Sequence, residues 1–370
     1  MRIIKSILTF FKKYVPLFAA VNFILGIVSA VLYVSFLNSK AFADLFNENV
    51  SPVFRMLFAK LTYVFPISVA EALIITSPVL IFLILRAIFR YMDSREHGFC
   101  RSLISMVSVL ALLFCVFAVN FAAGYRGSTL DEKLELETGA VSVEELKDTL
   151  SYVTDKLNTL ADGVHFNRRG ESVRSCTHGE TVNKAYRSYE RLTETYDFIH
   201  NFKAPVKRLA ASELMTYTHI SGIYTFFTGE ANLNTNYPEF VNVFTVAHEM
   251  AHQRGIAREN EANFMAYLVC IGSDDTYMQY SGYLNMFEYL ISALSGESSD
   301  AAKEYYSALD GRIYRELVLY SEFFDKYRDS AASDVVGSVN DAYLQSQGTP
   351  GTKSYGMVVD LAVAYHKNVK

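Results

Sequence analysis

Three long apolar stretches dominate the first third of the chain. Residues 14–37 and 102–125 carry no charged side chain, and residues 66–89 carry only Glu71 and Arg86. A run of about 20 mainly apolar residues is long enough to cross the hydrocarbon core of a bilayer as a helix. The sequence therefore predicts three transmembrane helices.

Charge divides the chain into two parts and orients it in the membrane. Residues 1–123, the predicted membrane domain, contain 11 Lys and Arg and 5 Asp and Glu, whereas residues 124–370 contain 23 and 34. Positive clusters beside membrane spans usually face the cytoplasm, so three spans place residues 124–370 outside it. An acidic remainder lacks the concentrated basic face that nucleic-acid binding needs. The two clusters consist of Arg2, Lys5, Lys12 and Lys13 before the first span and of Arg86, Arg90, Arg95 and Arg101 around the second connection.

The connections of the membrane domain leave two points open. Residues 38–65 predict a mixed loop whose amphipathic stretch, residues 53–65, is suited to a membrane surface. Glu71 lies about a turn inside the second span, where a carboxylate is costly in lipid. It either makes a polar contact to another helix or to the rest of the chain, or reaches the membrane interface.

The second part of the chain has the pattern of a mainly helical domain. Ser142 and Glu145 have the spacing of a capping box at the start of one such helix. Residues 163–180 are polar and predict a loop. Apolar residues at helical spacing predict helices at about 141–160, 181–200, 277–294, 301–327, 334–345 and 357–366.

Residues 222–236 differ in kind from these helical segments. They are rich in Tyr, Thr and Phe and alternate with a period of two, which predicts a hairpin that turns at Gly229. Such a strand beside a catalytic helix can accept an extended peptide as a further strand. The candidate residues for this substrate edge are Tyr224, Glu230, Asn232 and Asn234; the alternative is a hairpin that only packs on the helix.

A metal-binding pattern follows the hairpin. Residues 248–252 read His-Glu-Met-Ala-His, the His-Glu-x-x-His pattern of zinc hydrolases. On a helix, residues four apart are rotated by only about 40°, so His248 and His252 can bind one ion. Glu249 is offset by about 100°, which favours a role as general base towards a water activated by one Zn²⁺.

A third ligand is expected just after this helix. Gly255 is suited to the turn that ends it, and a second helix near residue 257 carries Glu259 and Asn263 one turn apart. Glu259 is the favoured ligand, with Asn263 orienting a ligating side chain. Glu261 is the rival third ligand; it lies about 200° round the helix from Glu259, so only one of the two can face the ion.

Other polar groups have less definite roles. A Tyr or His often stabilises the oxyanion in such sites, and His219, Tyr283 and Tyr355 are the candidates. No Cys-x-x-Cys pair exists, which argues against a cysteine zinc site or a thioredoxin-like site. Cys176 and Cys270 either pair outside the cell or leave Cys270 buried on the second motif helix.

Three segments carry a family resemblance. Together with the three spans, SGIYTFFTGEANLN, AHEMAHQRGIARENEANFMAYLVC and SYGMVVDLAVAY resemble the bacterial domain-of-unknown-function family 3810. The motif block is also similar to gluzincin metallopeptidases, which implies that His248, His252 and Glu259 hold zinc and that Glu249 is the base. Only six residues separate His252 from Glu259, fewer than in many gluzincins. A metzincin would have a histidine at Arg258.

Together these patterns predict a mainly α protein: three transmembrane helices, then an extracytoplasmic zincin-like α+β domain with a small sheet beside the zinc helix. The expected function is that of a membrane-anchored zinc metallopeptidase acting on a peptide or protein of the cell envelope. Two alternatives remain, a zinc-binding sensor or scaffold without catalytic activity and a hydrolase of cell-wall amides.

Overall fold

The computed structural model describes residues 11–94 and 97–369, without the side chains of residues 94, 355, 368 and 369. Arg2, Lys5 and Arg95, which belong to the predicted basic clusters, lie outside this part. Helices make up most of the described chain, and two small sheets accompany them.

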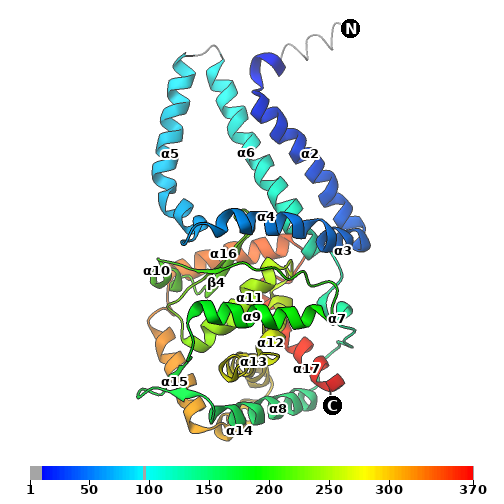
Figure 1. Ribbon diagram of the computed structural model, residues 1–370, viewed down its shortest axis with the longest axis vertical. Coiled ribbons are helices and arrows are strands. Elements are labelled where there is room, and N and C mark those ends of the chain that lie inside the picture. Colours follow the sequence, from blue (N-terminus) through cyan, green and yellow to red (C-terminus); the bar gives the residue numbers. More distant parts are fainter. Residues whose placement is uncertain (1–10, 95–96, 370) are drawn as a thin grey trace.

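Three helices project together from one end of the molecule (Figure 1). They are α2 (Leu17–Asn38), α5 (Val69–Ser94) and α6 (Gly98–Asn120), and each is long and apolar enough to cross a membrane. The third ends earlier than predicted, because residues 122–125 form a short 3-10 helix, η1 (Ala122–Tyr125), instead of continuing α6. The three expected apolar helices are therefore present.

Glu71 makes a polar contact to the rest of the chain, one of the two roles predicted for it. Its carboxylate oxygens accept hydrogen bonds from the backbone N–H groups of Ala210 and Ala211 at 2.9 and 2.8 Å. These residues precede α10 (Ser212–Thr216). The first turn of α5 is thereby fastened to the body of the protein.

The segment between the first two apolar helices is helical, and the prediction of a mixed loop was wrong. Ser39 caps α3 (Lys40–Asn49), and α4 (Ser51–Tyr63) follows it with a proline in its first turn. Both lie crosswise at the base of the three projecting helices (Figure 1). Val53, Leu57 and Leu61 of α4 are one turn apart and more than 49% exposed. This stripe is suited to a membrane surface.

The remaining helices form a body around α11 (Glu239–Gln253), α12 (Glu259–Ile271) and α13 (Thr276–Glu297), whose side chains supply much of its hydrophobic core. The capping box predicted at Ser142 and Glu145 is present at the start of α8. The other helices are α7 (Leu130–Lys133), α8 (Val143–Ala161), α9 (His178–Thr193), α14 (Ser299–Ala308), α15 (Gly311–Asp325), α16 (Ala331–Ser346) and α17 (Val358–Val369), with a second 3-10 helix, η2 (Gly351–Met357).

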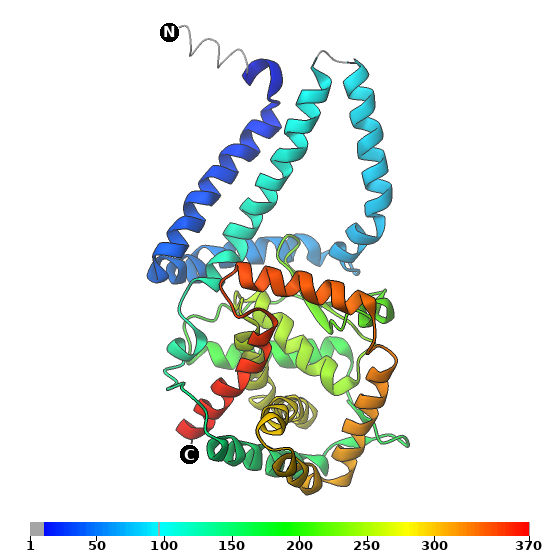
Figure 2. The ribbon, with the colours of Figure 1, turned by 180° about the vertical axis from the view of Figure 1, so that it is seen from behind.

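The single helix predicted for residues 301–327 is in fact two. Leu309 has an extended backbone, and the side chain of Asp310 accepts a hydrogen bond from the N–H of Arg312 and so caps α15. The apolar spacing continues across this break, which is why the pattern alone did not reveal it. α15 is followed by α16, which lies across the body on the side that faces the three projecting helices (Figure 2).

The predicted hairpin is confirmed and belongs to a three-stranded sheet. β4 (Gly222–Thr225) and β5 (Glu230–Leu233) are antiparallel, and Gly229 at their turn has φ +69°. β3 (Val206–Arg208) pairs parallel to β5, which gives the order β3-β5-β4 and leaves β4 at an edge. A second sheet, β1 (His165–Phe166) and β2 (Ser172–Val173), lies within the predicted polar loop.

Cys176 and Cys270 are free thiols and form no disulfide. Cys270 is fully buried on α12. The structure therefore agrees with the alternative in which this residue continues the apolar face of the second motif helix.

Candidate metal centre

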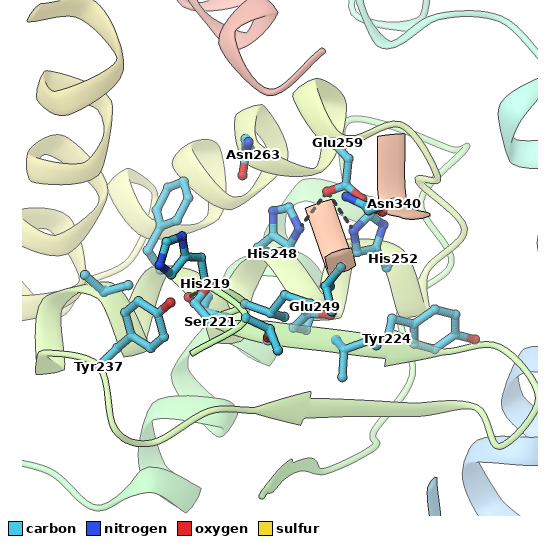
Figure 3. Close-up of a pocket in the computed structure, with 18 of the residues that line it drawn as sticks. His219, Ser221, Tyr224, Tyr237, His248, Glu249, His252, Glu259, Asn263 and Asn340 are labelled. Carbon is cyan, nitrogen blue, oxygen red and sulfur yellow. Dashed lines mark hydrogen bonds and ion pairs between the residues drawn. The ribbon is translucent and has the colours of Figure 1, made fainter. Parts of the chain in front are cut away.

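The centre is built on α11, a buried helix. Phe240, Val243 and Val246 are almost completely shielded from solvent and hold α11 against its neighbours. His248 and His252 lie one turn apart near its C-terminal end, with ring centroids 4.6 Å apart. Figure 3 shows both imidazoles turned towards the same space beside α12.

The turn after α11 fixes the orientation of His252. Gly255 has φ +92°, a conformation that favours glycine and reverses the chain. The backbone then returns, and the carbonyl oxygen of Ile256 lies 2.8 Å from His252 Nδ1. When Nδ1 donates to this carbonyl, Nε2 is left free to accept a metal ion.

Glu259, the first residue of α12, completes the cluster. Its Oε2 lies 3.3 Å from His248 Nε2 and 3.4 Å from His252 Nε2. The three ligand atoms all lie within 4.8 Å of one another. Two imidazoles and a carboxylate are the donor set that catalytic zinc sites use, so these residues fit a metal ion.

The charges of this cluster are strongly coupled. Burial acts to lower the pKa of His252, but the adjoining Glu259 carboxylate outweighs it and raises this pKa to about 9. Burial acts to raise the pKa of Glu259, and the two imidazoles hold it well below its usual range. A negative carboxylate thus lies between two imidazoles, where a divalent cation would meet an ionised ligand.

Glu249 is buried next to the cluster. Its Oε2 has no hydrogen-bond partner among the described residues. Burial raises the pKa of this carboxyl to about 8. Oε1 faces β4, where a Cβ on Gly222 would lie only 2.5 Å away. The carboxyl therefore has one oxygen against the strand and one without a partner.

Glu261 and Asn263, the two other residues predicted near the third ligand, lie in different surroundings. Glu261, the rival ligand, accepts hydrogen bonds from Arg258 Nη1 at 2.8 Å and from the N–H of Leu130 at 3.1 Å. It is thus turned away from both histidines. Asn263 lines the same cleft as the cluster and lies beside His248. Burial lowers the pKa of this imidazole, and Glu259 and Asn263 act against that shift without outweighing it.

Only one of the predicted substrate-edge residues lies on the edge strand. Tyr224 is on β4 and lines the cleft. Glu230 and Asn232 are on β5, the central strand, and Asn234 follows it; all three are buried. The prediction that these three residues lie at the edge of the sheet was wrong, because β5 is paired on both sides, with β3 and with β4.

The three oxyanion candidates also differ in position. His219 lines the cleft, and its Nε2 is 2.7 Å from the carbonyl oxygen of Tyr327. Tyr283 is buried against Tyr152 and Tyr267 and is not among the cleft-lining residues, so its prediction was wrong. The side chain of Tyr355 lies outside the described part of the chain.

The metal cluster opens into a cleft of about 1030 Å³ that sequence reasoning did not foresee. Its walls are mainly aromatic and include Phe244, Tyr289 and Tyr320. α16 covers it with Asn340 and Tyr343, and Asn340 lies close to the cluster in Figure 3. Nothing in the sequence of α16 distinguishes it from an ordinary amphipathic helix.

A second unforeseen residue is Arg55 of α4, which supports the turn from beneath. It is 1% exposed and donates to Asn47 Oδ1 at 2.9 Å and to the carbonyl oxygen of Asn120 at 3.0 Å. A Cβ on Gly255 would meet its guanidinium at 2.5 Å. Helix α4, at the base of the three apolar helices, therefore directly contacts the turn between α11 and α12. The feature of the sequence that could have identified Arg55 is its position as a charged residue among the apolar residues of the stretch 53–65.

Comparison with known proteins gives one match. The family described as "Protein of unknown function (DUF3810)" matches residues 46–363. Searches of curated proteins and of solved structures gave no match. The matched range includes the metal cluster, the hairpin and most of the membrane-proximal helices, so the chain belongs to this family of proteins of unknown function.

Proposed function

We propose that the protein is a membrane-anchored zinc metallopeptidase that hydrolyses peptide bonds. The observation that carries this proposal is the arrangement of His248, His252 and Glu259 within 4.8 Å, with the unpartnered Glu249 in the same cleft. A zinc ion held by such residues supplies Lewis acidity and makes a water molecule more acidic.

The residues of the chain have separate tasks in this reaction. Glu249 takes a proton from the attacking water and gives it to the leaving amine, a double role suited to a carboxylate that lies in the cleft and has no hydrogen-bond partner on Oε2 among the described residues. Its position is fixed by β4 on one side and by the rigid helix α11 on the other. His219 lines the cleft and is the candidate to donate a hydrogen bond to the oxyanion.

β4 supplies the backbone groups that an extended peptide needs. The N–H of Asn234 donates to the carbonyl oxygen of Ser221 at 2.9 Å, so these two residues form a hydrogen-bonded pair. Because such pairs alternate in an antiparallel ladder, the backbone groups of Gly222 and Tyr224 point away from β5. They are therefore free at the edge beside Glu249, where a substrate strand can pair.

The proposed location is the outer face of the membrane. The first residues of α2 and α6 and the last residues of α5 lie at the same end of the three apolar helices, the end away from α11 (Figures 1 and 2). Lys12, Lys13, Arg90 and Arg101 lie at this end. The positive-inside rule then assigns this end to the cytoplasm and the metal cluster to the other side. Envelope proteins or peptides are the substrates within reach.

Turnover tests the proposal. The purified full-length chain in detergent, loaded with zinc, is incubated with a mixed peptide library, and new termini are identified by mass spectrometry. We expect cleavage by the wild type and a loss of at least about 10²-fold in Glu249→Gln, because the general base is removed while the metal ligands stay. Equal zinc content in both proteins without cleavage by either would favour a scaffold.

A further inference from the structure

A second cavity adjoins the cleft of the metal cluster. It also has a volume of about 1030 Å³ and lies among α13, α14 and α15. Four residues line both cavities: His219, Glu288, Tyr320 and Phe324. The two cavities therefore meet at this wall, and a side chain of a peptide lying in the cleft can reach it.

Glu288 is an acidic group without a partner at this wall. It is the only charged residue in the first 21 positions of α13. No hydrogen bond or ion pair to its carboxylate is formed within the described residues. Burial raises its pKa to about 8, and the like charge of Glu316 adds to this effect. A partly buried carboxylate at the wall of a cavity is stabilised in its ionised form by an incoming cation.

Among the described residues, no lysine or arginine forms an ion pair with this carboxylate. Lys303 and Arg328 line the second cavity, but they pair with Asp300 at 2.8 Å and with Asp325 at 2.7 Å. Their side chains are 72% and 60% exposed, so solvent screens them. Each is already engaged with an acidic residue three positions away.

Tyrosines line both cavities that Glu288 borders. Tyr306, Tyr314 and Tyr320 line the second cavity together with Glu288, and Tyr289 lines the cleft. The rings of Tyr306 and Tyr314 are 6.5 Å apart at an angle of 77°. Aromatic faces attract cations, most strongly where water is excluded. A carboxylate among tyrosines is suited to an ammonium or guanidinium group.

We propose that Glu288 and these tyrosines form a subsite for a lysine or arginine side chain of the substrate. The inference rests on the proposed peptidase function and specifies its substrate class: peptides with a basic residue at a fixed distance from the cleaved bond. Glu288 acts here as a specificity-determining residue, and it takes no part in the proton transfers of Glu249.

Binding without turnover tests this subsite. The full-length Glu249→Gln protein, loaded with zinc, is titrated by calorimetry with the blocked peptide acetyl-Ala-Ala-Lys-Ala-Ala-amide. Its arginine and norleucine counterparts are titrated in the same way. We expect the lysine and arginine peptides to bind at least about tenfold more tightly than norleucine, since only they complete the charge pair. An unblocked norleucine peptide that binds as tightly as the lysine peptide would assign the subsite to a chain terminus and overturn the proposal.

A variant of the subsite and a matched control complete the test. Glu288→Gln keeps the size of the side chain and is expected to remove the tenfold preference, with a melting temperature no lower than that of the wild type. Glu297→Gln makes the same change at an exposed position of the same helix and is expected to keep it. Cleavage of a peptide library without a preference for basic residues, unchanged by Glu288→Gln, would refute the subsite and leave the peptidase intact. Preferential binding of the lysine peptide without cleavage of any peptide would support the subsite and refute the peptidase function.

Discussion

Replacement of Gly222 by alanine tests how closely β4 approaches the general base. The added Cβ would lie 2.5 Å from Glu249 Oε1 and 2.6 Å from Thr245 Cγ2, whereas ordinary contact begins near 3.4 Å. Gly222 has no positive φ, so alanine is compatible with its backbone conformation. The strand or the carboxylate must therefore move by about 0.9 Å.

The expected magnitude follows from this displacement. A shift of about 1 Å in a catalytic group costs on the order of 10²-fold in rate, and one excess methyl in a packed site costs about 1–3 kcal/mol of stability. Gly222→Ala should thus lose about 10²-fold in kcat/KM for a cleaved peptide. Zinc content should stay unchanged, because the ligands come from α11 and α12 and not from β4.

The assay compares Gly222→Ala with wild type in kcat/KM, zinc content and melting temperature. Gly139→Ala is the matched control, since nothing lies within 4 Å of the position of its Cβ. It should cleave at the wild-type rate. If Gly222→Ala keeps kcat/KM within twofold of wild type, Glu249 does not need the contact with β4 and its proposed positioning is refuted.

Three further predictions concern the contacts between the membrane-proximal helices and the body. Glu230→Gln should lower the free energy of unfolding by about 3–5 kcal/mol, measured by denaturant titration, because the buried ammonium group of Lys207 loses its ion-pair partner. An unchanged denaturation midpoint would contradict this. Arg55→Met should lower the affinity for zinc at least about tenfold in a chelator competition, since the turn at Gly255 between the proposed ligands loses its contact with the guanidinium. Equal zinc affinity in the variant and the wild type would show that α4 does not influence metal binding. Burial acts to raise the pKa of Asp44, but hydrogen bonds from Ser128 keep it below its usual value near 3.8. The ionised Asp44 carboxylate therefore stabilises the folded state above pH 3.8, and this contribution is lost as the pH falls below that value. Between pH 5 and pH 3, the melting temperature of Asp44→Asn should therefore fall less than that of the wild type.

Local signals in the sequence identified most of the candidate metal site. The His-Glu-x-x-His spacing, the glycine after it and the pair Glu259 and Asn263 all act within one or two helical turns, where chain geometry alone fixes which side chains meet. The choice of Glu259 over Glu261 agrees with the structure for this reason. The apolar helices and the hairpin were equally local and appear close to their predicted boundaries.

Contacts between distant segments could not be read in the same way. Arg55 supports a turn 200 residues later in the chain, and Glu230 binds Lys207 and the N–H groups of Val69 and Ala70 instead of a substrate. The sequence shows these residues as polar but does not say which segment packs against them. Glu288 is similar: its isolation on an apolar helix was visible, while the cavity around it depends on α14 and α15.

Zinc stoichiometry tests the central claim most directly. Elemental analysis of the full-length chain, purified in detergent without chelator, should give one zinc per wild-type chain. The same value is expected for Glu249→Gln and Glu261→Ala, and a value close to zero for His248→Ala and Glu259→Ala. A wild-type protein without metal, or loss of zinc in Glu261→Ala with retention in Glu259→Ala, would contradict the account.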